Sequence, residues 1–247
     1  FAFACLGFSG GAADKADYAR ELVRSRRYTI THDAEIALTG ATNGDPGILV
    51  IGGTGSIAFG RNAAGRTARA GGWGYIFGDE GGGFDLTRRA LRAALRDEEG
   101  WGPATQLRSM LLAATGAPDM NDLLHRFYTP AFPRPQIASF SRLVSSAAAV
   151  GDEIARQILR DAASALALYA GGVYHQLFSA DEEFQVAYVG GVFTSDLLRN
   201  EFDRLIQEQM EAIPGPPQFG PAAGALLEAL RGDGNESRLS HVPEFEK

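Results

Sequence analysis

Two glycine-rich stretches of the chain combine a flexible backbone with side chains capable of polar chemistry. The first, GGTGS, runs from Gly52 to Ser56 and carries two hydroxyls. The second, GGWGYIFGDEGGG, spans residues 71–83 and holds seven glycines beside one tryptophan and two acids. A linker does not need those side chains, and a core strand does not tolerate so much glycine. Both stretches therefore raise the question of which ligand the backbone approaches.

The GGTGS stretch follows the apolar segment ILVI and is suited to holding an anion. Its glycines let backbone N–H groups converge, and Thr54 and Ser56 can donate to phosphate oxygens. A tight hairpin without a ligand is the alternative. The overlapping GTGSIA also fits the dinucleotide pattern G-x-G-x-x-A, but that motif must open a helix, and Gly60 and Gly65 follow too closely for one. We therefore discount a dinucleotide site.

A candidate site of another kind is GFSGG at residues 7–11, which fits the nucleophile elbow G-x-S-x-G of serine hydrolases. Ser9 would be the nucleophile, with Asp181 and His241 as the acid and the histidine that such an enzyme needs downstream. Almost no sequence precedes Ser9, whereas a hydrolase places several strands and an oxyanion loop before it. A serine hydrolase is thus the less favoured alternative.

Asp33 is the remaining carboxylate of interest, because the chain turns there after the strand-like segment YTITH. Taken alone, it could be a helix N-cap as well as a catalytic group. Its neighbour His32 is one of four histidines, and no two of them have the helical spacing of a metal site. The histidines therefore predict no metal centre.

The elements that must position these residues follow from hydrophobic periodicity and turn residues. We predict strands at 1–8, 28–32, 48–62 (two strands joined at 52–55) and 184–193, and helices at 12–27, 84–99, 152–173 and 198–210. We expect Gly171 and Gly172 to interrupt the third of these helices. The proline-containing stretch 129–136 is expected to be irregular, 232–247 to be loose, and NGDPG at 43–47 to mark a domain junction. Alternating strands and helices predict an α/β protein.

Composition sets limits on the function. The chain has 247 residues, 45% of them apolar and 21% charged, and a formal net charge of −7, which argues against a surface that binds nucleic acid. The single cysteine, Cys5, permits no internal disulfide, four-cysteine zinc site or iron–sulfur cluster, and it predicts a cytoplasmic protein. The longest uncharged window, 162–180, contains glycines, a histidine and a glutamine, so no membrane span is expected.

The order of these segments carries a family resemblance. Asp33-Ala34 at a strand end, the turn at Thr54, GGWGYIFGDEG, VGGVF and GPAAGALLEAL resemble the N-acetylglucosamine kinase and BadF/BadG/BcrA/BcrD ATPase family, in the sugar kinase, heat-shock ATPase and actin superfamily. The resemblance spans Leu6 to Leu230. It implies α/β architecture with two ribonuclease H-like (actin-like ATPase) domains and an interdomain cleft. The C-terminal domain would be 45–224, and the N-terminal domain would be 1–44 with part of 225–247 returning to it.

The resemblance also implies roles for individual residues. Asp33, in DAEIA, matches the family's catalytic aspartate and would act as general base. The sugar would be bound by Gly72, Trp73, Gly74 and Asp79. The phosphates would lie at Gly53, Thr54, Gly55 and Ser56. Adenosine would be held by Gly190, Gly191, Gly224 and Ala225. ATP and Mg²⁺ would be the cofactors, with no metal ligand assigned.

The chain also departs from the family pattern. The family's first phosphate motif, an aspartate followed by glycines and threonine, and its early sugar-contacting region are absent. Because the sequence starts with Phe1 inside a predicted strand, we expect upstream sequence to be missing and the N-terminal domain to be incomplete. Gly82 replaces a common serine, and the iron–sulfur activators of the broader family are excluded because they need cysteines.

The expected function is therefore ATP-dependent phosphorylation of an amino sugar, N-acetylglucosamine or glucosamine, at the C6 hydroxyl. A homodimer is the expected assembly. The alternative from another class is a non-catalytic sugar- or nucleotide-binding protein of the same fold, which the missing phosphate motif would favour.

Overall fold

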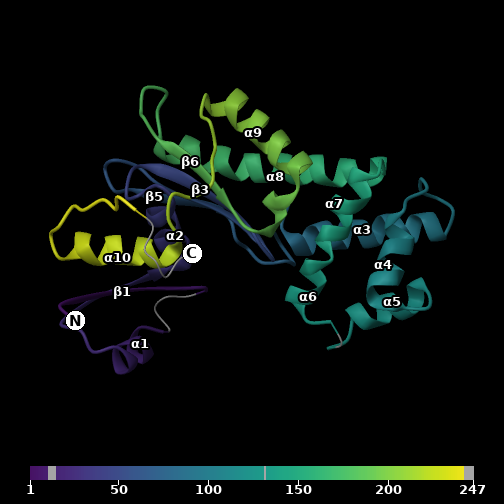
Figure 1. Ribbon diagram of the computed structural model, residues 1–247, viewed down its shortest axis with the longest axis horizontal. Helices are drawn as coiled ribbons and strands as arrows, with labels where there is room; N and C mark the ends of the chain where they lie inside the picture. Colours follow the sequence, from purple (N-terminus) through teal and green to yellow (C-terminus); the bar gives the residue numbers. More distant parts are fainter. Residues whose placement is uncertain (11–14, 131, 242–247) are drawn as a thin grey trace.

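The larger part of the protein is built on a four-stranded mixed sheet (Figure 1). The computed structural model describes residues 1–10, 15–130 and 132–241. The strand order is β5-β4-β3-β6, with β3 antiparallel to β4 and parallel to β6. The strands are β3 Gly47–Gly52, β4 Ser56–Arg61, β5 Thr67–Gly71 and β6 Gln185–Val189. The predicted strand pair around residues 52–55 is confirmed, whereas β5 was not predicted.

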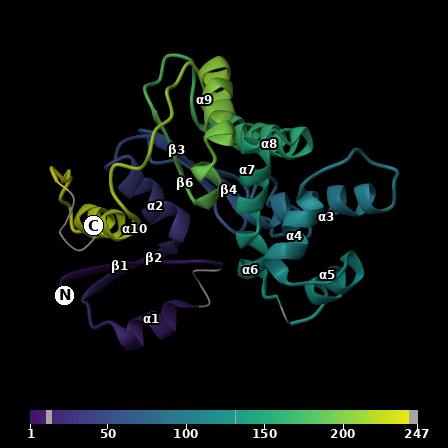
Figure 2. The same ribbon diagram turned by 45° about the vertical axis from the view of Figure 1, so that its right-hand side comes forward.

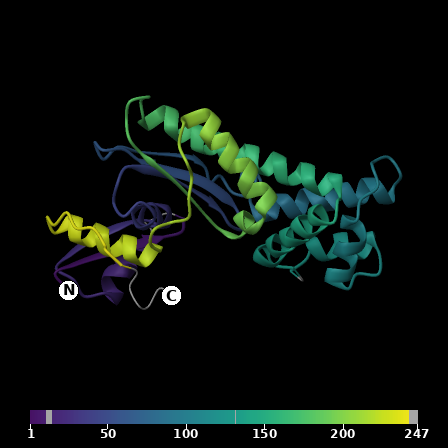
Figure 3. The same cartoon turned by 45° about the horizontal axis from the view of Figure 1, so that its top comes forward.

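Helices cover both faces of this sheet, which explains the continuous apolar run ILVI in β3. Successive strand side chains point to opposite faces. Ile48 and Val50 pack on the side of α8 (Glu153–Leu177), and Leu49 packs with α2 (Asp33–Ala41) on the other. Figure 3 shows α8 lying along the sheet beside α9, Asp196–Met210. A strand buried on both faces must be apolar at every position.

The N-terminal part is a two-stranded parallel sheet with helices packed on it. Strands β1 (Phe3–Phe8) and β2 (Arg27–His32) are joined through α1, Ala16–Leu22. The last helix, α10 (Pro221–Gly232), packs against α2 and β1, so the end of the chain returns to its beginning (Figures 1 and 2). Since α2 contacts both sheets, the domain boundary after residue 44 stays a prediction.

A group of helices extends from the larger sheet on the side away from the termini (Figures 1 and 2). Its members are α3 Gly83–Glu98, α4 Leu107–Thr115, α5 Met120–Phe127, α6 Arg134–Ser139 and α7 Ser141–Ala149. The expectation of irregular chain at 129–136 is wrong from Arg134 onward. Pro133 precedes α6 and Pro135 lies in its first turn, where proline's missing N–H and fixed φ are tolerated.

The helix α8 continues through Gly171 and Gly172 to Leu177, so the predicted interruption is wrong. Gly171 is buried, and a Cβ there would lie 3.5 Å from Gln209 Oε1 on α9. That distance is an ordinary van der Waals contact, so the helix contact does not itself require glycine. The packing of α8 against α9 and the sheet maintains the helix despite the intrinsic cost of glycine, about 1 kcal/mol per residue. Helix packing has therefore overridden a local propensity.

Candidate functional site

A cavity of about 1080 Å³ opens between the two sheets, where β1, β2 and β3 end. Its lining includes Asp33, the β3–β4 hairpin, Gly72 and Asp79. These residues come from four separate segments of the chain. Their meeting in one cleft is the geometry from which a function can be argued.

Asp33 lies at the mouth of the cavity, where β2 passes directly into α2. It is the first residue of α2, and the N-cap is His32, so Asp33 itself is not the N-cap. Its Oδ1 accepts a hydrogen bond from the N–H of Ala34 (2.8 Å), and the side chain is otherwise exposed. His32 Nδ1 lies 3.1 Å from the carbonyl oxygen of Gly10. A strand end followed at once by a helix thus holds an exposed carboxylate toward the cavity.

The β3–β4 hairpin is anchored through its carbonyl groups. The N–H of Gly83 donates to Gly53 O (2.8 Å), and the N–H of Phe84 donates to Thr54 O (3.0 Å). Across the described ranges, the Thr54 hydroxyl has no protein hydrogen-bond partner. The sequence GGTGS enters β4 and opens no helix, which confirms that it is not a dinucleotide motif. The hairpin therefore leaves the Thr54 hydroxyl available to a ligand.

Ser56 is held differently from Thr54. Its hydroxyl donates to the backbone oxygen of Glu80 (2.6 Å), and the residue is buried. Any contact of Ser56 with phosphate would therefore need its N–H rather than its hydroxyl. The hydroxyl instead fixes the loop that carries Asp79.

Asp79 has the conformation and the surroundings of a functional residue. Its φ is 62°, in the left-handed region, and the residue is only 8% exposed. A Cβ on Gly55 would lie 2.3 Å from Asp79 Oδ2, so glycine is needed for the carboxylate to pack there. Within the described part of the chain no hydrogen bond reaches this carboxylate. A buried carboxylate without a protein partner is costly, which favours a polar ligand in the cavity.

Tyr169 on α8 anchors the same loop, and sequence reasoning missed it. Its hydroxyl donates to the Glu80 carboxylate, and the Glu80 N–H donates to the tyrosine oxygen (3.3 Å). Burial, followed by the hydrogen bond to Glu80 and the charge of Glu80, raises the pKa of Tyr169 to about 12. The sequence placed Tyr169 only as an apolar position of a helix, because nothing local indicates a partner 89 residues away.

The proposed sugar-binding residues are only partly brought together. Gly72 and Asp79 line the cavity, whereas Trp73 and Gly74 are not in its lining. Trp73 is 66% exposed, and the guanidinium carbon of Arg69 lies 4.9 Å from its ring centroid. The tryptophan thus contacts the cavity through an arginine that does line it.

The four residues predicted to hold adenosine lie outside this cavity. A Cβ on Gly190 (φ 116°) would lie 2.3 Å from Gly52 O, so its backbone packs on the base of the hairpin. Gly191 begins a short 3₁₀ helix, η2 Gly191–Thr194. A Cβ on Gly224 would lie 1.8 Å from Ile36 O, which makes Gly224 the close-contact point of α10 with α2. A role of these residues and Ala225 toward adenosine stays a prediction.

The components of the hydrolase hypothesis are not brought together. Ser9 lines the cavity, but within the described residues neither Asp181 nor His241 is among the lining, and His241 Nδ1 lies 3.1 Å from the Ser240 hydroxyl. Gly11 of the GFSGG pattern lies outside the described residues. The structure therefore gives this alternative no support.

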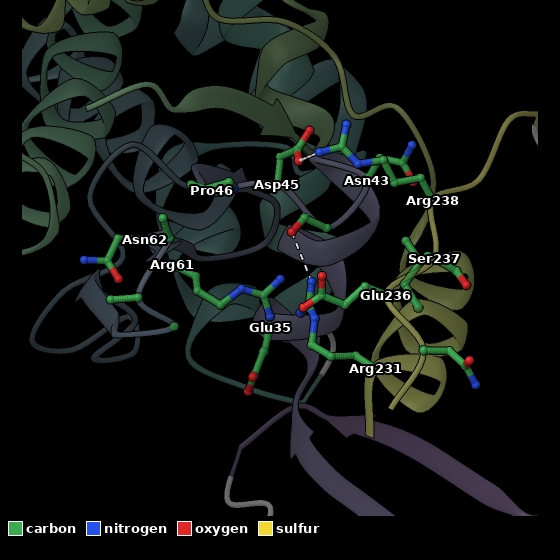
Figure 4. A pocket seen from close by; sticks show the side chains of 16 residues that line it. Glu35, Asn43, Asp45, Pro46, Arg61, Asn62, Arg231, Glu236, Ser237 and Arg238 are labelled. Atoms are coloured by element: carbon green, nitrogen blue, oxygen red, sulfur yellow. Dashed lines mark hydrogen bonds and ion pairs between the residues drawn. The ribbon is translucent and has the colours of Figure 1, made fainter. Parts of the chain in front are cut away.

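A second cavity, of about 700 Å³ (Figure 4), lies behind α2, and the three arginines of its described lining all pair with carboxylates. Arg61 reaches it from β4 and Arg231 from α10, and both form ion pairs with Glu228, at 2.5 and 2.7 Å. At its rim Arg238 forms an ion pair with Asp45. This cluster joins β4, α2 and α10, and no arginine of the described lining is left without a carboxylate partner.

No three His, Cys, Asp or Glu side chains form a metal-binding group in residues 1–10, 15–130 and 132–241. Mg²⁺ needs few protein ligands, because it keeps several waters and binds one or two carboxylates together with substrate phosphates. The exposed carboxylate of Asp33, on the same cavity as the Thr54 hairpin, fits that kind of site. Separately, none of the described helices is both long enough and apolar enough to span a membrane.

Comparison with known proteins agrees with this arrangement. Residues 1–229 match the BadF/BadG/BcrA/BcrD ATPase family. An N-acetylmuramic acid/N-acetylglucosamine kinase from Clostridium acetobutylicum is 36% identical over 208 residues, covering 82% of this chain and 68% of that protein. An N-acetyl-D-glucosamine kinase from Dictyostelium discoideum is 34% identical over 239 residues, covering 92% and 74%.

Solved structures show the same fold. A candidate N-acetylglucosamine kinase from Chromobacterium violaceum has a TM-score of 0.73 and 30% identity, covering 91% of this chain and 74% of that one. A ROK family glucokinase from Streptomyces griseus, solved with glucose and AMPPNP, has a TM-score of 0.53, covers 89% and 70%, and at 15% identity bears on the fold alone. The predicted ribonuclease H-like, actin-like ATPase fold is confirmed. Because the match extends over nearly the whole sequence, the chain belongs to the BadF/BadG/BcrA/BcrD ATPase family.

Proposed function

We propose that this protein is an ATP-dependent kinase of an amino sugar, N-acetylglucosamine or glucosamine. The observation that carries the proposal is one cavity lined by an exposed carboxylate, a hairpin with an unpartnered hydroxyl, and a buried carboxylate without a protein partner. These are Asp33, Thr54 and Asp79. The identity to kinases of N-acetylglucosamine supports the sugar class.

In this proposal the sugar hydroxyls bind Asp79, and the hydroxyl at C6 faces Asp33. Phosphoryl transfer has a loose transition state, so the protein mainly aligns the two reactants and stabilises charge. Asp33 accepts the proton of the attacking sugar hydroxyl. The oxygen of that hydroxyl bonds to the γ-phosphorus, and the bond between the γ-phosphorus and the β,γ-bridging oxygen breaks, which releases ADP. The N–H groups of the hairpin and the Thr54 hydroxyl hold the phosphates. The phosphates at the Thr54 hairpin and a carboxylate of the cavity would hold Mg²⁺, which would supply neutralisation of the phosphate charge.

The experiment that tests the function is ADP release from ATP with N-acetylglucosamine, glucosamine, glucose or no sugar. Release that requires one sugar, with a 6-phosphate product by NMR, supports the proposal and names the substrate. Sugar-independent release, or none from a protein that binds sugar, supports the non-catalytic alternative instead. A fluorophosphonate probe that labels Ser9 would revive the hydrolase hypothesis.

We also propose a homodimer and the domain division described above. The exposed apolar side chains Ile76 (65% exposed) and Phe77 (84%) are the surface to test first, because such groups are commonly buried by a partner. Light scattering of the protein and of Phe77→Ser measures the assembly. A monomeric mass for the unsubstituted protein would exclude the dimer.

Replacing Trp73 with alanine is expected to raise the KM for sugar about two- to fivefold and to leave the KM for ATP unchanged. Loss of a stacked arginine contact is worth ~0.5–1 kcal/mol, and it releases Arg69 at the cavity wall. Trp101→Ala is the matched control, because Arg96 stacks on Trp101 at 5.0 Å on an exposed surface away from the cavity. Equal loss of sugar and ATP affinity would make Trp73 a structural residue.

Replacing Gly55 with alanine is expected to raise the KM for sugar by about tenfold or more. The new methyl group would overlap Asp79 Oδ2, and relieving such overlap costs ~1–3 kcal/mol or moves the carboxylate. Gly53→Ala is the comparison within the same hairpin, because a Cβ there meets no atom within 4 Å. Steady-state kinetics with both variants checks this, and equal sugar KM values would remove Asp79 from sugar binding.

A further inference from the structure

Two acids are adjacent in the loop between β5 and α3, but only one of them faces the cavity. Asp79 lines the cavity of about 1080 Å³, whereas Glu80 is not among its described lining residues. The Glu80 carboxylate instead accepts a hydrogen bond from the Tyr169 hydroxyl of α8, and the Tyr169 oxygen accepts one from the Glu80 N–H at 3.3 Å. Tyr169 therefore holds Glu80 through both its side chain and its backbone.

The backbone conformation of Asp79 needs support from its surroundings. Its φ of 62° is rare for a residue with a side chain, and such a conformation persists only where neighbouring structure holds it. The neighbouring residue supplies that support, because Glu80 also accepts a hydrogen bond at its backbone oxygen from the Ser56 hydroxyl, at 2.6 Å. The Gly82 N–H then donates to the Asp79 carbonyl oxygen at 3.0 Å and closes the turn. The orientation of Asp79 is thus set largely through Glu80.

One face of α8 supports the rest of this loop and the segment before it. A Cβ on Gly81 would lie 2.9 Å from Leu166 Cγ, so the loop backbone lies directly on the helix. Leu166 and Tyr169 are three positions apart and share that helix face. A Cβ on Gly71 would lie 2.7 Å from the Tyr169 ring. Tyr169 therefore contacts both segments that carry the proposed sugar-binding residues, the one that begins at Gly71 and the loop of Asp79.

We propose that Tyr169 is a positioning residue of the sugar site: it holds the Glu80 carboxylate away from the cavity and leaves Asp79 as the acid of this loop that meets the sugar. The inference rests on the proposed sugar kinase function. Burial, followed by the hydrogen bond to Glu80 and the charge of Glu80, raises the pKa of Tyr169 to about 12, so the hydroxyl remains a donor at neutral pH. Without that hydroxyl, Glu80 loses a partner for its carboxylate and for its N–H.

Titration calorimetry with N-acetylglucosamine, glucosamine and, separately, ATP tests this role. Tyr169→Phe and Glu80→Ala should each weaken sugar binding by about tenfold while changing ATP binding by less than about twofold. Glu80→Gln should keep sugar affinity within about threefold, because its amide oxygen still accepts from the tyrosine hydroxyl. Tyr174→Phe is the matched control, because Tyr174 is also on α8 but lines a different cavity, and it should change neither affinity.

A double substitution shows whether the two residues act as one unit. Tyr169→Phe with Glu80→Ala should weaken sugar binding by about tenfold in total, because both changes remove the same hydrogen bond. Circular dichroism checks that each variant is folded. The Glu80 variants carry the test if Tyr169→Phe does not fold.

Four results would contradict the positioning role. Unchanged sugar affinity in Tyr169→Phe and Glu80→Ala, or a loss in Glu80→Gln as large as in Glu80→Ala, shows that the hydrogen bond does not position Asp79. Equal loss of sugar and ATP affinity makes the pair a structural support only. Additive losses in the double substitution separate the two residues.

ADP release is measured separately and distinguishes this role from the proposed function. Sugar binding that depends on Tyr169, without sugar-dependent ADP release, supports the positioning role and counts against the kinase alone. Sugar-dependent release that is insensitive to Tyr169→Phe supports the kinase and excludes the positioning role. Binding of neither sugar by the unsubstituted protein would overturn both.

Discussion

Asp33→Asn should lower the rate of phosphoryl transfer by ~10²- to 10⁴-fold while leaving the fold and ligand binding intact. Loss of general-base assistance raises the barrier by roughly 3–5 kcal/mol. Asparagine has nearly the same shape and can still accept the 2.8 Å hydrogen bond from the Ala34 N–H. Because the side chain is exposed, the substitution leaves no unpaired buried group. The loss should therefore appear in kcat, with dissociation constants for sugar and ATP changed little.

The chain offers a matched control for this substitution. Asp196 is also the first residue of a helix, α9, and is also exposed, but it pairs with Arg199 away from the cavity. Asp196→Asn should leave kcat unchanged. The rate of ADP release gives kcat for both variants, and titration calorimetry gives their dissociation constants for sugar and ATP. Near-normal turnover by Asp33→Asn would remove Asp33 from the mechanism, and loss of ATP binding would make it a nucleotide contact.

Glu228→Ala should lower the free energy of unfolding by ~3–5 kcal/mol, because it leaves Arg61 buried without its counter-charge. The Arg61 and Glu228 side chains are each about 10% exposed and lie 2.5 Å apart. Thr39 of α2 donates to the same carboxylate at 2.5 Å. One carboxylate on α10 therefore ties β4 to α2. Denaturant unfolding at neutral pH measures the loss.

An exposed ion pair provides the comparison. Glu153, whose side chain is 64% exposed, pairs with Arg160 at 2.8 Å, and Glu153→Ala should cost less than about 1 kcal/mol. The double substitution Arg61→Met, Glu228→Leu should recover much of the loss, because no buried charge is then left unpaired. A loss of similar size for Glu228→Ala and Glu153→Ala would show that burial does not set the strength of the first pair.

The same carboxylate predicts a pH dependence. Burial raises the pKa of Glu228, but hydrogen bonds from Arg61 and Thr39 and the charges of Arg61 and Arg231 outweigh it, so the net pKa lies below its ordinary value. The contribution of Glu228 to stability is therefore fully present above the pKa of the unfolded chain. It is lost as the pH falls through the lower pKa of the folded protein. The difference in unfolding free energy between the unsubstituted protein and Glu228→Gln should shrink over that acid range, and a constant difference would contradict it.

Much of the local structure followed from the sequence. The apolar run before GGTGS predicted β3, and the three- and four-residue spacing predicted α9 and nearly the whole of α3, Gly83–Glu98. These elements are set by short-range periodicity. Strand β5 was not predicted, because its sequence TARAG has no run of large apolar residues. It is a strand because it pairs with β4. The predictions of an irregular chain at Pro135 and of a helix interruption at Gly171 were wrong for different reasons. Proline is tolerated in the first turn of a helix, and the packing of α8 against α9 and the sheet maintains that helix through its glycines.

By itself, the sequence determined the family and the segments that carry chemistry, because glycine, hydroxyl and carboxylate spacing reflects local backbone requirements. Only the tertiary structure decided how these segments meet. Within the described chain, the Thr54 hydroxyl has no hydrogen-bond partner, whereas the Ser56 hydroxyl donates to the backbone oxygen of Glu80. The tertiary structure also packs Gly224 against α2 and brings Tyr169 to Glu80. Those contacts join residues far apart in the chain, and their geometry is fixed by how the helices and sheets pack.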